Sequence, residues 1–136
     1  MSDANLHALF ERYVAVLNAH DFERLREFMH DDLVVNGAVT TREQMISDLY
    51  GHVAAVPDLT WRLQDVAIDG DRIAARFFNT GVPISAWLGA EPNGATVEYA
   101  EHVFHRIRDG RFYEQNFLLD EASIHRQLRT GPGAVQ

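Results

Sequence analysis

Residues 96–118 read TVEYAEHVFHRIRDGRFYEQNFL, two strand-like runs that are joined by Asp109-Gly110. An Asp-Gly pair between two such runs is a strong signal for a tight β-hairpin. A second Asp-Gly pair, Asp69-Gly70, precedes the strand-like run 72–80, and apolar residues alternate with polar ones from Leu59 onward. This half of the chain therefore predicts four long antiparallel strands.

The alternation changes phase within the first of these strands. Apolar residues take odd positions from Leu59 to Leu63 and even positions at Val66 and Ile68. A slip of one residue near Gln64-Asp65 predicts a β-bulge, and β-bulges bend the strand that carries them. We therefore expect a strongly bent sheet.

The first part of the chain carries helical patterns. Apolar side chains in residues 5–18 recur every three or four positions, which is typical of a helix with one buried face, and we expect Asp3 to cap it. Asp21 is expected to begin a second, shorter helix, and Thr40-x-x-Glu43 matches the capping box of a third. A short strand is expected at 33–35. This order predicts an α+β domain in which three N-terminal helices pack on a bent antiparallel sheet.

Length and composition exclude several classes of protein. The 136 residues suffice for one core, so we expect a single domain over residues 1–130 and a flexible tail at 131–136. The net charge of −8 argues against nucleic-acid binding, which relies on clustered positive charge. The chain has no cysteine, which excludes disulfides and thiol nucleophiles. With no export signal and no long apolar run, we expect a cytoplasmic protein without membrane contact.

The sequence contains no nucleotide-binding or metal-binding motif. His102 and His105 are its only closely spaced histidines, and on a strand this spacing places them on opposite faces. We therefore expect no metal and no other cofactor. The faces of this strand carry two sets of side chains: Glu98, His102 and Arg106 on one, and Tyr99, Glu101, Val103 and His105 on the other. Neither face of the hairpin is clearly the solvent face, so alternation alone leaves open which set points inward.

Six segments of the chain match patterns of known families: 13–21, 31–35, 57–59, 69–76, 109–111 and 126–128. The first two resemble the opening of NTF2-like (cystatin-like cone) domains, and the later ones resemble the SnoaL-like polyketide cyclase branch of that superfamily. The resemblance extends over residues 5–128 and implies the cone-shaped fold.

The resemblance also implies an activity, a cofactor-independent cyclase that closes a ring by an intramolecular aldol step on a polyketide-like, small hydrophobic molecule. In such cyclases an Asp at the end of the last strand is the general acid/base. It stands ten residues after the hairpin glycine, as Asp120 does after Gly110. The family often has His-Trp where this chain has Gln115-Asn116, and this departure bears on the substrate rather than on the acid/base group.

We expect Asp120 and His102 to be the catalytic residues. Burial against apolar walls would raise the pKa of Asp120 toward the range that acid/base catalysis needs. Other polar and aromatic side chains are expected to orient the substrate or to form the walls of its pocket. These substrate-binding candidates are Tyr13, Asn36, Trp61, Phe77, Phe112, Glu114 and Asn116.

Alternative roles remain open. Asp120 could serve only as the N-cap of a terminal helix, and Glu114 could pair with Arg106 across the strands. The chain could be a non-catalytic small-molecule-binding or assembly module, which would leave Asp120 at a rim, whereas an enzyme needs its carboxylate in a water-poor pocket. A dehydratase or epoxide hydrolase would need a second carboxylate near Asp120, such as Glu98 or Glu114. In each case we expect a homodimer formed through the outer face of the sheet.

Overall fold

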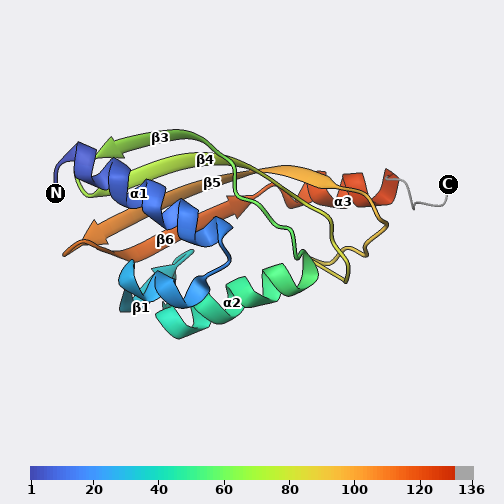
Figure 1. Ribbon diagram of the computed structural model, residues 1–136, viewed down its shortest axis with the longest axis horizontal. Coiled ribbons are helices and arrows are strands. Elements are labelled where there is room, and N and C mark those ends of the chain that lie inside the picture. The colour runs from blue at the N-terminus through green and yellow to red at the C-terminus, as the bar shows by residue number, and fades with distance from the viewer. Residues whose placement is uncertain (131–136) are drawn as a thin grey trace.

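A six-stranded sheet forms one layer of the molecule, and helices cover its inner face and lie at one end (Figure 1). The computed structural model describes residues 1–130, so the tail expected at 131–136 lies outside the described residues. No helix within this part of the chain is long and apolar enough to cross a membrane. The elements are α1 (Asp3–Asn18), η1 (Phe22–Glu27), β1 (Met29–Val35), β2 (Ala38–Thr41), α2 (Arg42–Ala55), β3 (Leu63–Asp69), β4 (Arg72–Gly81), β5 (Val97–Arg108), β6 (Arg111–Leu119) and α3 (Glu121–Thr130).

The strands follow the order β2-β1-β6-β5-β4-β3. Neighbours are antiparallel except β1 and β6, which run parallel. The four long antiparallel strands, both Asp-Gly hairpins and the α+β class are confirmed. The short strand expected at 33–35 is longer and is followed by β2, which we did not predict. These two strands form a hairpin whose turn, Asn36-Gly37, has positive φ at both residues.

Three helical segments precede the long strands, and the middle one, η1, is a 3₁₀ segment. Two of the predicted caps are wrong by one residue. Ser2, not Asp3, caps α1 by accepting a hydrogen bond from the Asn5 amide. Thr41, not Thr40, caps α2 by accepting one from the amide of Gln44. Asp3 is already the first residue of α1, whereas Thr40 lies one residue too far from α2, so the hydroxyls of Ser2 and Thr41 stand at the two N-cap positions and reach the first free N–H groups.

Two irregularities shape the sheet. The pairing of β3 with β4 shifts between Leu63 and Asp65, which confirms the predicted bulge. A second shift, which we did not predict, occurs where β5 meets β6: Ile107 pairs with Phe112 and Arg106 pairs with Glu114. The residue between them on β6 has no partner, so the alternation of inward and outward side chains changes phase there.

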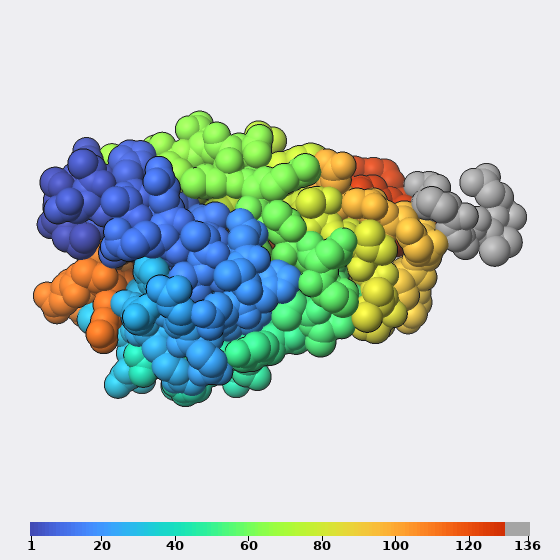
Figure 2. Space-filling view, in the orientation of Figure 1, coloured from blue at the N-terminus to red at the C-terminus, as the bar shows by residue number. Residues whose placement is uncertain are grey.

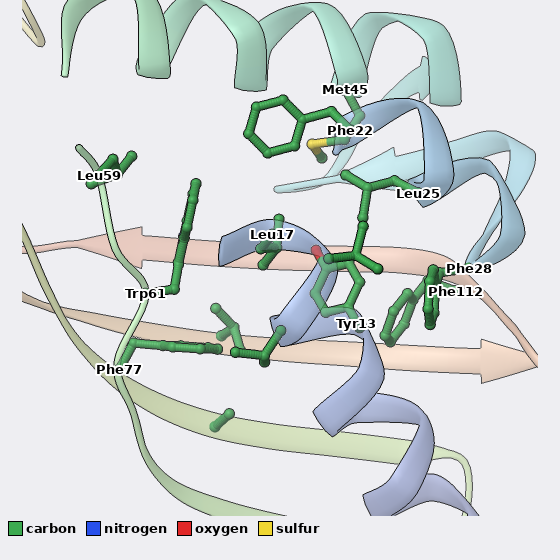
Figure 3. Close-up of a cluster of buried hydrophobic side chains, with 14 of the residues drawn as sticks. Tyr13, Leu17, Phe22, Leu25, Phe28, Met45, Leu59, Trp61, Phe77 and Phe112 are labelled. Carbon is green, nitrogen blue, oxygen red and sulfur yellow. The ribbon is translucent and has the colours of Figure 1, made fainter. Parts of the chain in front are cut away.

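The core lies between the sheet and the helices. The space-filling view in Figure 2 shows α1 and α2 covering the sheet on this side of the molecule. In Figure 3 the rings of Tyr13, Phe28 and Phe112 gather at one end of the core, while Trp61 and Phe77 lie together at the other. All five side chains are buried. Tyr13 of the first group and both residues of the second line a common cavity.

Candidate active site

A cavity of about 270 Å³ lies between the inner face of the sheet and the helices α1 and α2. Apolar and aromatic side chains, among them Trp61 and Phe77, form most of its walls. Asp48 of α2 and Glu121 of α3 also line it and are exposed to solvent, and we call this exposed part of the lining the mouth. A mostly apolar cavity with a few polar groups is the usual form of a small-molecule site.

Glu101 of β5 is a buried carboxylate in this cavity, with 6% of its surface exposed. Asn79 of β4, fully buried, donates a 2.8 Å hydrogen bond from Nδ2 to Oε1 of Glu101. The backbone N–H of Arg62 donates to Oδ1 of Asn79 at 3.3 Å, which fixes the orientation of that amide. Burial raises the pKa of Glu101 to about 7, although the hydrogen bond from Asn79 opposes the shift. A carboxyl group with this pKa can both accept and donate a proton near neutral pH.

Tyr13 of α1 brings a hydroxyl group to the same cavity. Gln115 of β6 donates a hydrogen bond from Nε2 to the Tyr13 oxygen at 3.3 Å. Burial raises the pKa of Tyr13 well above its ordinary value, and the negative charge of Glu101 raises it further. The phenol therefore stays protonated at neutral pH and can donate its hydrogen to a ligand.

His105 of β5 also lines the cavity and is 1% exposed. Its ring packs edge-on against Phe112 and Phe117, with ring centroids 5.2 and 5.1 Å away. Burial lowers the pKa of His105 to about 3, so the ring is neutral at neutral pH. Its Nδ1 atom is buried and has no hydrogen-bond partner of good geometry among residues 1–130. A buried polar atom without a partner is rare and marks a place where a ligand or water can bind.

The segment between β4 and β5 covers part of the cavity. Leu88 of this segment lines the cavity, and His125 of α3 donates a 2.6 Å hydrogen bond from Nε2 to its carbonyl oxygen. The neighbouring Trp87 donates a 3.0 Å hydrogen bond from Nε1 to Nδ1 of His52 on α2. Burial lowers the pKa of His52, so its ring is held neutral as the acceptor of this bond. Side chains of α2 and α3 thus hold the segment in place.

Four of the predicted site residues line the cavity: Tyr13, Asn36, Trp61 and Phe77. Asn36 also accepts a 2.8 Å hydrogen bond from the Phe117 amide through Oδ1, so its side chain supports the end of β6. Phe112 does not line the cavity. It is fully buried in the core, where its ring packs edge-on against Tyr13 at 4.9 Å.

Glu114 and Asn116 lie on β6 beyond the second register shift and do not line the cavity. Glu114 faces Arg106 on the neighbouring strand, with 3.6 Å between Oε2 and Nε, which confirms the alternative of a cross-strand ion pair. Asn116 donates from Nδ2 to the carbonyl oxygen of Phe104 at 3.2 Å. Glu98, the other carboxylate considered as a partner of Asp120, pairs instead with Arg62, with 2.8 Å between Oε2 and Nη2.

Asp120 and His102 lie together at a second, more open depression outside the cavity, beside Leu118. Asp120 is exposed and accepts a 3.1 Å hydrogen bond from the Ser123 amide, which confirms the predicted N-cap of α3. His102 is exposed because strand alternation places it on the face opposite Glu101. Neither side chain lines the cavity. Their catalytic roles stay predictions.

We did not predict Glu101 or His105 as site residues, nor Asn79, which does not line the cavity but holds Glu101. We also did not predict the other polar residues of the lining, which are Asp48, His52, Tyr99 and Glu121. Glu101 and His105 were placed on one face of their strand, but the direction of that face was left open. The sequence did contain a usable signal, because three apolar residues, Val97, Val103 and Ile107, share this face. The structure buries all three. Within residues 1–130, no three His, Asp or Glu side chains are placed to share a metal ion.

A bent sheet wrapped over helices around one apolar cavity defines an NTF2-like α+β cone. Within that class, the chain belongs to the SnoaL-like polyketide cyclase family, whose model matches residues 7–128. The chain matches no curated protein.

Solved structures agree with this assignment. A crystal structure of a SnoaL-like polyketide cyclase from Agrobacterium tumefaciens is 29% identical, with a TM-score of 0.84 over 90% of this chain and 97% of that one. TsrD from Streptomyces laurentii is 27% identical, with a TM-score of 0.85 over 94% and 97% of the two chains. IdmH from Streptomyces antibioticus is 26% identical, with a TM-score of 0.81 over 90% and 96%.

Proposed function

We propose that the protein is a cofactor-independent cyclase that closes a ring in a polyketide-like small molecule, with Glu101 as the general acid/base. One observation carries this proposal: a buried carboxylate, with a pKa raised to about 7, lies in a mostly apolar cavity. The family assignment supports the reaction class. Such a carboxylate suffices for this chemistry because a carbon between two carbonyl groups is already acidic.

The reaction we propose is an intramolecular aldol addition. The ionised carboxylate of Glu101 accepts a proton from a carbon between two carbonyl groups, and the electron pair of the broken C–H bond forms an enolate. The enolate carbon attacks a ketone carbonyl of the same molecule and forms the new C–C bond. The proton on Glu101 then passes to the resulting alkoxide, so the product is an isomer of the substrate and the carboxylate is regenerated.

The other cavity residues support these steps. Tyr13 remains protonated and can donate a hydrogen bond to the oxygen that gains charge in the enolate. Asn79 holds one oxygen of Glu101 and leaves the other for the substrate. Trp61 and Phe77 exclude water and help to fold the substrate so that its two reacting carbons meet.

Asp120 remains the sequence-based alternative for the acid/base. The proposal favours Glu101 because an enzyme needs this group in a water-poor pocket, whereas Asp120 is an exposed cap. Taken alone, the position of Asp120 would favour a non-catalytic binding module. Glu101 supplies the buried carboxylate that such a module does not need.

A ring-closure assay tests the proposal. The probe is a benzene ring that carries an acyl group and, at the neighbouring position, a β-keto ester arm. Its ring-closed product is an isomer of the same mass, and liquid chromatography separates the two by retention time. Wild type should accelerate closure over buffer, and Glu101→Gln should lose about 100-fold or more of that acceleration. Glu114→Gln, an outer-face variant, is the matched control and should keep it. Equal closure by wild type and Glu101→Gln would reject Glu101 as the acid/base and favour the binding module.

We further propose that two copies pair through the outer face of the sheet. Phe104 and Leu118 are exposed there, at 39% and 74%, and both strands belong to the middle of the sheet. Exposed apolar side chains on one face are typical of an interface. Light scattering should give a dimer for wild type and a monomer for Leu118→Asp. A monomeric wild type would contradict this proposal.

A further inference from the structure

We propose that the ligand of this cavity carries a protonated amine, which lies at the mouth near Asp48 and Glu121 while the ring system lies inside. The inference deepens the proposed function and rests on it in one respect, that this cavity is the substrate site. It adds the sign of the charge that the substrate carries. The argument rests on the charges, the aromatic walls and the unpartnered polar atoms of the lining.

The ionisable groups of the lining are unbalanced in sign. Asp48, Glu101 and Glu121 line the cavity, whereas no arginine does and the sequence contains no lysine. The arginines lie elsewhere, and several form ion pairs on the surface. None of the ion pairs within residues 1–130 includes Asp48 or Glu121. A ligand that enters therefore meets negative charge without a compensating cation from the lining.

The histidines of the lining do not change this balance. Burial lowers the pKa of both His52 and His105, so neither ring carries positive charge at neutral pH. His52 already uses Nδ1 as the acceptor for Trp87. An anionic ligand would thus find no charged partner in the lining and would be repelled by the carboxylates, whose interaction is stronger in a partly apolar cavity than in water.

The walls also suit a cation. Five aromatic rings line the cavity, and the face of an aromatic ring attracts an ammonium group. The combination of aromatic rings with carboxylates is therefore suited to a protonated amine. The aromatic side chains of the lining are Tyr13, Trp61, Phe77, Tyr99 and Phe117.

Two unpartnered atoms give independent support for a ligand with hydrogen-bond donors. His105 lines the cavity, and Gln115 lies behind Tyr13, to which its Nε2 atom donates. The unpartnered atoms are Nδ1 of His105 and Oε1 of Gln115. Both are buried, and neither makes a hydrogen bond of good geometry within residues 1–130. The Gln115 oxygen can only accept hydrogen bonds, and so can Nδ1 of a neutral ring whose proton is on Nε2. These atoms lie in the interior, so they support a ligand whose inner part donates hydrogen bonds, while the charge of the lining decides the group at the mouth.

A set of three matched probes tests the proposal. Naphthylmethylamine, naphthylmethanol and naphthoate share one ring system and are cationic, neutral and anionic at neutral pH. Their dissociation constants are measured by calorimetry at low ionic strength. We expect the amine to bind about tenfold tighter than the alcohol, and the naphthoate to bind most weakly.

Variants at the mouth test whether its two carboxylates cause the tighter binding of the amine. Asp48→Asn/Glu121→Gln should bring the amine to the affinity of the alcohol while the affinity for the alcohol stays the same. The control Glu11→Gln/Asp69→Asn removes two exposed charges that do not line the cavity, and it should keep the preference.

An amine that binds no tighter than the alcohol, or a preference that survives Asp48→Asn/Glu121→Gln, would overturn the inference. The outcome is separable from the proposed function, because binding is measured without turnover. Failure of Glu101→Gln to slow ring closure would reject the acid/base role and leave the amine preference intact. Loss of the amine preference would leave the role of Glu101 intact.

Discussion

Asn79 donates a 2.8 Å hydrogen bond to Oε1 of Glu101, and the two side chains come from neighbouring strands of the sheet. The contact holds one oxygen of the carboxylate and leaves the other without a partner within residues 1–130. It also limits the rise in the pKa of Glu101 that burial causes. Asn79 therefore sets both the position and the proton affinity of the group that we propose as the acid/base.

Replacing Asn79 by leucine should raise the pKa of Glu101 further, by about one unit above its value of about 7. Burial would then act without the opposing hydrogen bond. Carbon-13 NMR of the glutamate carboxyl groups measures the midpoint of the Glu101 titration directly. Asn116→Leu, on the outer face, is the control and should leave the midpoint in place. An unchanged midpoint in Asn79→Leu would show that the hydrogen bond does not set it.

Glu101→Gln should change how stability depends on pH. The pKa of Glu101 is raised from 4.5 to about 7 on folding, so above pH 4.5 the unfolded state ionises first. The free energy of unfolding of wild type then falls with rising pH until the folded state ionises near pH 7. The variant lacks this loss, so its free energy of unfolding should rise relative to that of wild type by up to about 3 kcal/mol between pH 4.5 and about 7. Urea denaturation at a series of pH values measures the difference, and a constant difference would contradict the buried carboxylate.

His105 should give stability the opposite dependence on pH. Its pKa falls from 6.5 to about 3 on folding, so the unfolded state binds the proton first as pH falls below 6.5. Wild type therefore loses stability between pH 6.5 and 3 through this group, and His105→Asn should not. Because Glu101 titrates in part of the same range, the comparison is between the two proteins at each pH, where its contribution cancels. Parallel acid denaturation curves would argue against a neutral buried ring.

Asp120→Ala should lower the free energy of unfolding by about 1 kcal/mol because it removes the N-cap of α3. Asp120→Asn should cost much less, since the amide oxygen can accept the same hydrogen bond from Ser123. Denaturant unfolding of the two variants measures both effects. Equal losses would mean that the negative charge, rather than the hydrogen bond, stabilises the helix.

The sequence predicted the elements that depend on local patterns. The hairpin at Asp109-Gly110 and the bulge near Gln64 are where the chain was expected to place them, since turn residues and phase changes act over a few positions. The caps at Ser2 and Thr41 were missed by one residue because neighbouring polar side chains compete for the same N–H groups. The strand β2 was missed because four residues carry too short a pattern.

Prediction of the site depended on knowing which face of the hairpin points inward. The local alternation of apolar and polar residues could not decide this. The second register shift changes the phase of β6 between Phe112 and Gln115, so both are buried although they differ in parity. This shift arises from pairing with β5 and with the parallel strand β1, which are distant contacts. His102 and Glu101 are adjacent in sequence, and only the folded sheet separates the exposed one from the buried one.

The rate of α-proton exchange of β-tetralone in deuterated buffer tests the central claim most directly. This aromatic ketone needs only proton removal and return, so the assay isolates the acid/base group from ring closure. We predict that wild type accelerates exchange, that Asp120→Asn keeps the acceleration within about twofold, and that Glu101→Gln loses about 100-fold or more of it. Full acceleration in Glu101→Gln, together with its loss in Asp120→Asn, would contradict the account.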